Sequence, residues 1–547
     1  MSNNTNMNIP AIPKEKFEFA NTAGKIHDKK FDDKPISYFK DAWIRFCKSR
    51  ASVVAAIIII LMIVFSVVCP LLITTHDKTF MDTYYAKKPA RIVWMKDNLG
   101  IMDGGVESTV PESEFIRILA IGVGAESGKD GQVITFAESM NSKYQPIIKN
   151  EYAGEFVNAK KQTVNQYNIR VDSYLLEGFI YDQVTQEEFA DILAWQEETG
   201  IQVLYPMIAG NEWNPSWSSA APNEPGDPNL WYKAVKNAGN PVSVRADGKT
   251  YTSLSFKEDM VFEENYKRDK EGNLVYKDMV ASSGANQTEC RIRVLYYNYY
   301  LYNNGFEPNY IMGTEAQGYD MALRIADGLQ LSLIIAVAVC VINFVLGALY
   351  GAVEGYYGGT LDLVLERVSD ILNGVPFIVV ATLFQLHLAS DLKMKLGQTL
   401  GAVVCLLFAY ILTGWIGTAY RVRTQFYRFK NQEYVMAART LGASDTRIIW
   451  KHIFPNTLGT IITSSALAIP GAIMSESMLS YLGIMKLGGA EGTSLGTILS
   501  DAQQNWTKAP HTLLYPAIVI SLLMICFNLF GNGLRDAFNP SLRGVEE

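Results

Sequence analysis

The chain has 547 residues, a formal net charge of −7 and a mean hydropathy of +0.06. This near-neutral hydropathy averages long apolar runs with one polar segment, residues 76–312, which carries 33 acidic and 23 basic residues. The polar segment has a net charge of −10 and the remainder +3. The sequence therefore lacks the clustered positive charge of nucleic-acid-binding proteins, and we expect no nucleic-acid partner.

The six cysteines also limit what the chain can do. Only Cys290 lies within residues 76–312, so this segment cannot contain an internal disulfide and must be stabilised by its own hydrophobic core. No cysteine and histidine spacing in the sequence is typical of a metal site. We therefore predict no metal site.

Residues 1–50 are polar and contain ten Lys or Arg residues. A polar stretch of this length is far longer than the charged region of a cleavable signal peptide. We predict that residues 1–50 form a cytoplasmic segment and that residues 51–73 form a transmembrane helix that is retained.

The polar composition of residues 76–312 indicates a soluble domain that contains both helices and strands. The pattern predicts a helix over residues 186–199, a strand over residues 291–302 and a surface loop over residues 211–240. That loop contains three tryptophans that we expect to be exposed, namely Trp213, Trp217 and Trp231. We predict an α+β domain.

One stretch of this domain superficially resembles a phosphate-binding loop. Such a loop requires Gly, four residues, then Gly-Lys-Ser/Thr. Around Gly128, however, Val123 occupies the position of the first glycine and Asp130 that of the hydroxyl residue. We therefore predict an ordinary loop over residues 122–130 and no nucleotide site.

Six apolar segments are long enough to cross the hydrocarbon core of a membrane, which requires about 20 helical residues. They are residues 51–73, 330–352, 371–389, 400–420, 457–479 and 511–531. The third is the least apolar and contains Pro376, so it could instead be a buried soluble helix. Pro376 and Pro470 can break or kink the third and the fifth spans.

Orientation follows from the distribution of Lys and Arg. Residues 421–456 carry seven basic residues, and both they and residues 1–50 should therefore be cytoplasmic. Counting spans then places residues 76–312 outside the cell and the C-terminus in the cytoplasm.

Two features within the spans indicate packing or transport. Gly347, Gly351 and Gly355 recur at four-residue spacing, which predicts a helix face on which a neighbouring backbone approaches closely. Glu476 lies near the end of the fifth span, where an ionisable side chain either faces a pathway or cavity or already lies in water at the outer rim.

The cytoplasmic segment 421–456 predicts a compact helical knob suited to a groove on a partner. Ala437 and Ala438 favour a helix, and Gly442 follows where that helix could end. Asp445 could then cap a second helix through residue 452, which Pro455 would stop before the fifth span.

This segment resembles the coupling loop of ATP-binding-cassette (ABC) importer permeases, with its pattern Glu-Ala-Ala, three residues, Gly, nine residues, Ile-x-Leu-Pro. The matching positions are Ala437, Ala438, Gly442 and Pro455, whereas Met436, His452 and Phe454 replace the family's Glu, Ile and Leu. Residues 437–445 are similar to the dipeptide and oligopeptide branch. So are the stretches 40–50, 313–320 and 527–536, and the combination resembles the C-type permease subunit.

The resemblance implies an α-helical polytopic membrane protein with six transmembrane helices and the type I ABC importer permease fold. A soluble domain, residues 76–312, would be inserted between helices 1 and 2, and residues 313–547 would form the permease core. The chain would be a multi-pass protein of the bacterial plasma membrane. It would import dipeptides or oligopeptides, although nickel or another small solute remains an alternative cargo. A membrane-anchored external sensor or enzyme is an alternative of a different class.

The resemblance also implies partners. These are a second permease subunit forming a heterodimer, two ATPase subunits that bind ATP and Mg, an extracytoplasmic substrate-binding protein, and membrane lipid. This chain would then be no enzyme and hold no cofactor. Family members have only a short loop between helices 1 and 2, so the resemblance implies nothing about the domain 76–312. Three roles stay open for it: docking the binding protein, binding a ligand itself, or acting as a spacer.

Specific residues carry these implied roles. Coupling to the ATPase would fall to small side chains, which act sterically, and to two charged ones; together these are Ala437, Ala438, Arg439, Gly442, Ala443 and Asp445. The family motif before helix 2 corresponds to Gly313, Thr314, Gly318 and Asp320. Glu315 and Tyr319 stand where the family has Asp and Arg, and Glu476 is a possible pathway residue.

Overall fold

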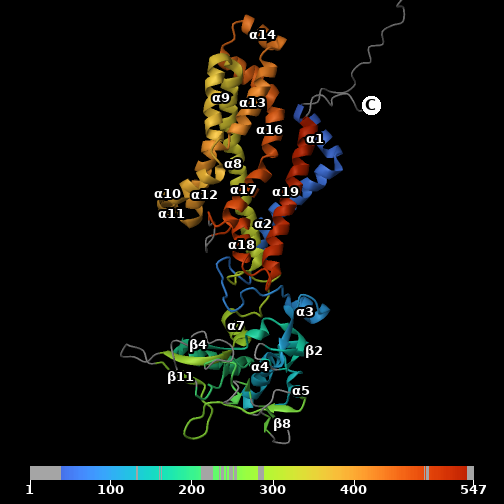
Figure 1. Ribbon diagram of the computed structural model, residues 1–547, viewed down its shortest axis with the longest axis vertical. Helices are drawn as coiled ribbons and strands as arrows, with labels where there is room; N and C mark the ends of the chain where they lie inside the picture. Colours follow the sequence, from blue (N-terminus) through green and yellow to red (C-terminus); the bar gives the residue numbers. More distant parts are fainter. Residues whose placement is uncertain are drawn as a thin grey trace, which may run out of the picture.

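The computed structural model describes residues 38–130, 134–158, 161, 163–210, 226–232, 234–235, 240–241, 243–245, 250–251, 256–280, 289–485, 487 and 492–538. The molecule is elongated (Figure 1). A helical bundle forms one end, and a domain of mixed helices and strands, referred to as the mixed domain, forms the other.

Five helical stretches in the described part of the chain are long and apolar enough to cross a membrane. They are α2 (Arg50–Leu72), α8 (Met321–Tyr357), α12 (Gln398–Thr413) with α13 (Ile416–Phe429), the stretch Asp445–Tyr481, and α19 (Pro510–Phe538). Five of the six expected spans therefore correspond to such a stretch. A short helix, α1 (Tyr38–Lys48), precedes α2.

The expected third span, residues 371–389, is not one straight helix. The chain forms α9 (Gly359–Asn373) and α10 (Phe377–His387), which meet at an angle of 71°. Pro376 lies at the break, where its ring disfavours a helical conformation in the preceding residue and its nitrogen cannot donate a hydrogen bond. The bent pair would provide a sixth span only if both helices together cross the membrane. A further short helix, α11 (Ala389–Leu396), follows.

The glycine face predicted on α8 packs against α13. A Cβ atom on Gly351 would lie 2.2 Å from the carbonyl oxygen of Ala419, and one on Gly347 would lie 2.6 Å from the Cβ of Thr418. Gly355 is equally close to Phe426, at 2.6 Å. The two backbones can approach this closely only because these positions carry no side chain.

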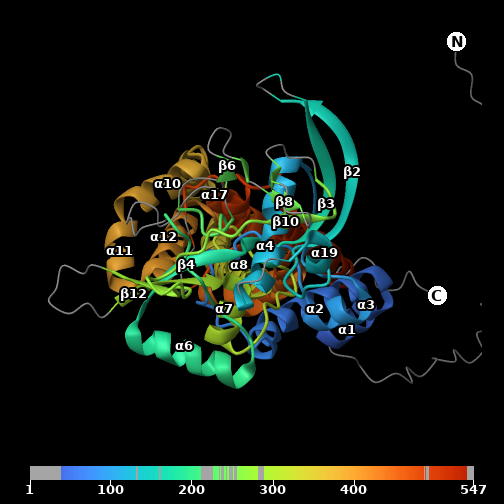
Figure 2. The ribbon, with the colours of Figure 1, turned by 90° about the horizontal axis from the view of Figure 1, so that it is seen from below.

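The mixed domain contains two main antiparallel sheets. The first has the order β1-β3-β2, with β1 (Gly105–Pro111), β3 (Thr163–Asp172) and β2 (Ile147–Val157). The second joins β11 (Lys277–Met279), β12 (Glu289–Leu295), β4 (Phe179–Thr185) and β5 (Leu204–Tyr205). The hairpin of β2 and β3 curves away from the body of the domain (Figure 2).

Short strands, five α-helices and a short 3-10 helix (Leu175–Glu177) complete the described part of the mixed domain. The strands are β6 (Ala234–Val235), β7 (Asn240–Pro241), β8 (Ser243–Arg245), β9 (Thr250–Tyr251) and β10 (Met260–Phe262). The helices are α3 (Val93–Leu99), α4 (Glu112–Asp130), α5 (Phe136–Ser139), α6 (Gln186–Thr199) and α7 (Tyr296–Asn304). The helix expected over residues 186–199 is thus confirmed as α6. The strand expected over residues 291–302 is wrong beyond Leu295, because β12 ends there and α7 begins at Tyr296.

The expected loop over residues 122–130 is wrong, because these residues belong to α4. Its glycines serve packing: a Cβ on Gly124 would lie 2.4 Å from the indole nitrogen of Trp231, and one on Gly122 would collide with Gln145. Trp231 is fully buried, and its indole donates a hydrogen bond to the Ala120 carbonyl at 2.9 Å. The expected exposure of Trp231 is therefore also wrong, whereas Trp213 and Trp217 lie outside the described residues.

The contact between α8 and α13 can be tested with Gly351→Ala. The added methyl group would meet backbone, which cannot move aside, so we expect a loss of about 1–3 kcal/mol and a lower midpoint of thermal unfolding in detergent. Gly417→Ala is the matched control, because that position on α13 has no atom within 4 Å of an added Cβ. Equal unfolding midpoints for the two variants would contradict this account of the packing.

Candidate functional site

The segment expected to form a coupling loop lies at the end of the bundle opposite the mixed domain (Figure 1). It consists of α14 (Glu433–Thr440), a break, and α15 (Asp445–Arg447), which continues into a π-helical turn (Ile448–Ile453). Its inner side packs on α8 and α13 through Val435, Ile448 and Ile453, all fully buried. The loop is therefore a compact knob seated on the bundle.

Gly442 ends α14, as the sequence predicted. Its φ angle is +81°, a left-handed conformation that favours glycine. The Gly442 amide donates to the Arg439 carbonyl at 3.0 Å, and the Ala443 amide donates to the Ala438 carbonyl at 3.1 Å. This pair of bonds is the Schellman motif, which satisfies carbonyls left free at a helix C-terminus.

Asp445 does not cap the second helix as expected. Ser444 occupies the N-cap position, and the Asp445 carboxylate instead accepts a hydrogen bond from the Tyr356 hydroxyl of α8 at 2.5 Å. An Arg439 Nη atom donates to the same hydroxyl oxygen at 3.4 Å. The two charged residues of the expected set are thus brought together on one tyrosine that the sequence analysis did not identify.

The expectation that Pro455 stops the helix is also wrong. The chain continues through α16 (Phe454–Ala466) and α17 (Ile469–Tyr481), with Pro455 in the first turn of α16. A proline needs no hydrogen bond at a helix start, and the wider π-helical turn before it relieves the clash of its ring with the preceding turn. Pro470 has the corresponding place in the first turn of α17.

The outward surface of the knob includes small and apolar side chains beside charged ones such as Glu433 and Arg447. Ala437 is exposed and Ala438 half-buried, while the Leu441 side chain beside the break is 88% exposed and Met436 is 54% exposed. An exposed apolar surface on a rigid helical element is typical of a site that docks into a groove of a partner protein.

At the other end of α8, the family motif forms a second site, the outer clasp, defined by residues 313–320 and the segment 76–90. Gly313 and Gly318 have φ angles of +77° and +98°. A Cβ on Gly318 would lie 1.9 Å from the Asp82 carbonyl oxygen, and one on Gly313 would lie 2.4 Å from that of Lys88. These glycines are therefore required both by conformation and by close backbone contact.

Polar side chains close the outer clasp. The buried Thr314 hydroxyl accepts a hydrogen bond from the Lys88 amide at 2.8 Å and donates to the Tyr85 carbonyl. Asp320 caps α8 by accepting from the Ala322 amide at 2.8 Å, and it lies 3.5 Å from Nδ1 of the buried His76. The clasp thus joins both ends of the polar segment to the start of α8.

Glu315 and Tyr319, the two residues that depart from the family motif, both contact Arg324. Glu315 is buried, with Oε1 3.3 Å from Nε of Arg324, and the Arg324 guanidinium lies over the Tyr319 ring at 4.5 Å from its centroid. Burial raises the pKa of the Glu315 carboxyl to about 7, and Arg324 opposes this rise.

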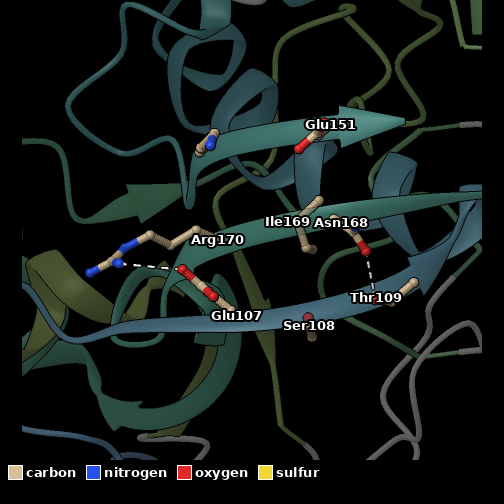
Figure 3. Close-up of a pocket in the computed structure, with 8 residues that line it drawn as sticks. Glu107, Ser108, Thr109, Glu151, Asn168, Ile169 and Arg170 are labelled. Atoms are coloured by element: carbon tan, nitrogen blue, oxygen red, sulfur yellow. Dashed lines mark hydrogen bonds and ion pairs between the residues drawn. The ribbon is translucent and has the colours of Figure 1, made fainter. Parts of the chain in front are cut away.

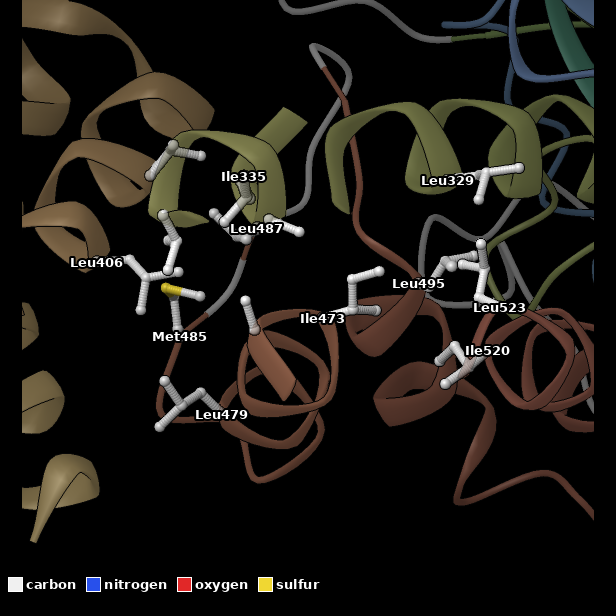
Figure 4. Packing of buried hydrophobic residues seen from close by; sticks show 14 of the residues in the cluster. Leu329, Ile335, Leu406, Ile473, Leu479, Met485, Leu487, Leu495, Ile520 and Leu523 are labelled. Atoms are coloured by element: carbon white, nitrogen blue, oxygen red, sulfur yellow. The ribbon is translucent and has the colours of Figure 1, made fainter. Parts of the chain in front are cut away.

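Glu476 is fully buried, so the expected alternative of a wet outer rim is wrong. Its carboxylate accepts hydrogen bonds from the Ser332 hydroxyl of α8 at 3.0 Å and from the Ser480 hydroxyl of α17 at 2.9 Å. Ile473 and Leu479 of α17 belong to the hydrophobic cluster of the bundle, as does Leu495 of α18 (Leu495–Ala502) (Figure 4). Serine hydroxyls stabilise the buried carboxylate here. Its role in a pathway stays a prediction.

An open hollow of about 490 Å³ lies on the β1-β3-β2 sheet of the mixed domain (Figure 3). Its lining is polar and its side chains pair with one another. Thr109 donates to Asn168 at 2.7 Å, and Arg170 lies 3.6 Å from Glu107. This arrangement is typical of a solvated sheet face, and we assign no chemistry to it.

The outer clasp predicts a pH dependence of stability. Because the Glu315 pKa is about 7 in the folded chain and 4.5 is its ordinary value, the folded state binds more protons between these pH values. Stability should therefore fall as the pH rises through this window, by up to about 3 kcal/mol. Glu315→Gln should flatten the fall in the thermal unfolding midpoint between pH 5 and pH 8, whereas the exposed Glu187→Gln should not. An unchanged slope in Glu315→Gln would contradict this account.

Two family models match the chain. Residues 347–544 match the binding-protein-dependent transport system inner membrane component, and residues 37–90 match the N-terminal TM domain of oligopeptide transport permease C. The first match contains the knob, and the second contains α2 and one half of the outer clasp.

Individual proteins agree with these matches. The chain is 39% identical over 237 residues to the dipeptide transport system permease protein DppC of Bacillus subtilis (strain 168), covering 42% of this chain and 68% of that relative. It is 38% identical over 231 residues to the oligopeptide transport system permease protein OppC of the same organism, covering 42% and 72%. The solved inward-facing MetNI methionine ABC transporter gives a TM-score of 0.31 at 16% identity, over 40% of this chain and 98% of that chain. The identity and coverage of the two B. subtilis relatives show that the chain belongs to the family of dipeptide and oligopeptide ABC transport permeases, and its five long apolar helical stretches indicate a helical membrane protein with several spans.

Proposed function

We propose that the chain is the transmembrane permease subunit of an ABC importer that carries dipeptides or oligopeptides into a bacterial cell. The observation that carries this proposal is the helical knob of residues 433–447, which is seated on the bundle and exposes small and apolar side chains. A mere membrane anchor would need no such surface. The peptide cargo is supported by the names of the two B. subtilis relatives.

The proposed assembly contains a second permease subunit, in a heterodimer, and two ATPase subunits beneath the pair. The ATPases would bind ATP and Mg and hydrolyse the nucleotide, while this chain would be no enzyme and hold no cofactor. An extracytoplasmic binding protein would deliver the peptide. The exposed side chains of Met436 and Leu441 would lie in the groove of one ATPase, with Ala437 against its wall.

The proposed orientation places the knob and both termini in the cytoplasm and residues 76–312 outside. The concentration of Lys and Arg in residues 1–50 and 421–456 supports this orientation. The position of α14 at the opposite end of the bundle from the mixed domain agrees with it (Figure 1). Under this proposal the protein is a multi-pass component of the plasma membrane.

In the proposed architecture, α9 and α10 together complete six spans of a type I importer permease. The mixed domain is an insertion between the first and second of these spans. One family match ends at residue 90 and the other begins at residue 347, which supports an insertion between them. The outer clasp binds the two ends of the inserted chain together.

The assembled importer provides the test. Wild-type complex in proteoliposomes should accumulate a labelled peptide only when ATP and the binding protein are present. Ala437→Trp should lower this uptake at least tenfold, because a bulky side chain on the exposed face of the knob would prevent seating on the ATPase. Overpacking of a well-packed contact costs about 1–3 kcal/mol. The measurement is the initial rate of uptake, together with the amount of ATPase that co-purifies.

Thr424→Trp is the matched control, because Thr424 is an exposed position on α13 outside the knob. This control should keep both uptake and ATPase binding. Wild-type rates in Ala437→Trp would be incompatible with the proposed docking surface.

A further inference from the structure

Tyr356, in the last turn of α8, connects the two halves of the knob to the bundle. The Tyr356 side chain is 7% exposed. Its hydroxyl donates to the Asp445 carboxylate at 2.5 Å and accepts from Arg439 at 3.4 Å. Arg439 precedes the break at Gly442 and Asp445 follows it, so one hydroxyl contacts both halves.

Two chemical features strengthen the contact of Tyr356 with the knob. A hydrogen bond to a carboxylate is stronger than one between neutral groups. The Arg439 guanidinium also lies 5.8 Å from the centre of the Tyr356 ring, close enough for a cation–π attraction. Displacement of either half of the knob would therefore pull on the end of α8.

The end of α8 is in turn bound to its neighbours. Arg423 of α13 forms ion pairs with Asp362 and Glu366 of α9 at 2.6 and 3.0 Å, and lies 3.7 Å from Glu354 of α8. Lys430 donates a hydrogen bond to the Gly355 carbonyl at 3.0 Å. These contacts hold the inner ends of α8, α9 and α13 as one body immediately beside Tyr356.

We propose that Tyr356 is a positioning residue that transmits movement of the knob to the body formed by the inner ends of α8, α9 and α13. This inference rests on the proposed function, because it assumes that the ATPase moves the knob. Tyr356 acts through Asp445 and Arg439 and contacts neither nucleotide nor peptide. Its hydroxyl makes each ATP hydrolysed effective in transport.

A purely structural role would make a different prediction. If Tyr356 only filled space, its aromatic ring would suffice and the hydroxyl would be dispensable. Tyr356→Phe keeps the ring and its cation–π contact with Arg439, and removes only the hydrogen bonds of the hydroxyl with Asp445 and Arg439. The informative readout is therefore the number of peptides taken up per ATP hydrolysed, which a loss of folded protein would not change.

The experiment compares Tyr356→Phe with Tyr357→Phe in the complete importer in proteoliposomes. Tyr357 is the adjacent residue on the same helix, and its side chain is 53% exposed. We expect Tyr356→Phe to lower peptide uptake per ATP by about tenfold, as befits a lost hydrogen bond to a charged group. Tyr357→Phe should retain the wild-type ratio.

Asp445→Ala, which removes the acceptor of the Tyr356 hydroxyl, and the double variant identify the contact responsible. If the hydroxyl acts through Asp445, the double variant should lose no more than the worse single variant, because both remove the same interaction. Losses that multiply would overturn the proposal, and so would a wild-type ratio in Tyr356→Phe or a Tyr356→Phe complex that fails to assemble. Failure of the proposed function itself would be seen separately, as a wild-type complex without ATP-dependent uptake.

Discussion

The structure depends on the continuity of α8, one helix of 37 residues from Met321 to Tyr357. At 1.5 Å per residue it is about 55 Å long and joins the two ends of the bundle. Its first turn is capped by Asp320 within the outer clasp, and its last turn carries Tyr356 at the knob. A rigid element fixed at both ends can relate events on one side of a membrane to those on the other.

Contacts along α8 explain how so apolar a helix has a defined position. The glycine face allows α13 to lie directly against its inner half, so that backbone meets backbone and little rotation is possible. Nearer the outer end, Ser332 donates to the buried Glu476 and ties α8 to α17. The clasp then fixes the N-terminal end of α8 and attaches the mixed domain to it, because the clasp binds the two ends of the segment 76–312 together.

Features that depend on residues close in sequence could be predicted. The spacing of Gly347 and Gly351, the helix end at Gly442 and the helix α6 are local patterns with a physical meaning of their own. Features that depend on distant partners could not. Tyr356 meets Asp445 from 89 positions away, and Ser332 meets Glu476 from 144 positions away. The expected break at Pro376 is confirmed by the 71° bend between α9 and α10. The expected stop at Pro455 is wrong, because the π-helical turn before it accommodates the proline at the start of α16.

The central claim is that the knob faces an ATPase subunit, and crosslinking from Leu441 tests it most directly. A photoreactive residue at position 441, whose native side chain is 88% exposed, should crosslink to the ATPase in the membrane-embedded complex. The same residue at position 94, an exposed tryptophan of the mixed domain, should not. A crosslink to the ATPase from position 94, or none from position 441 in a complex that still imports peptide, would contradict the account.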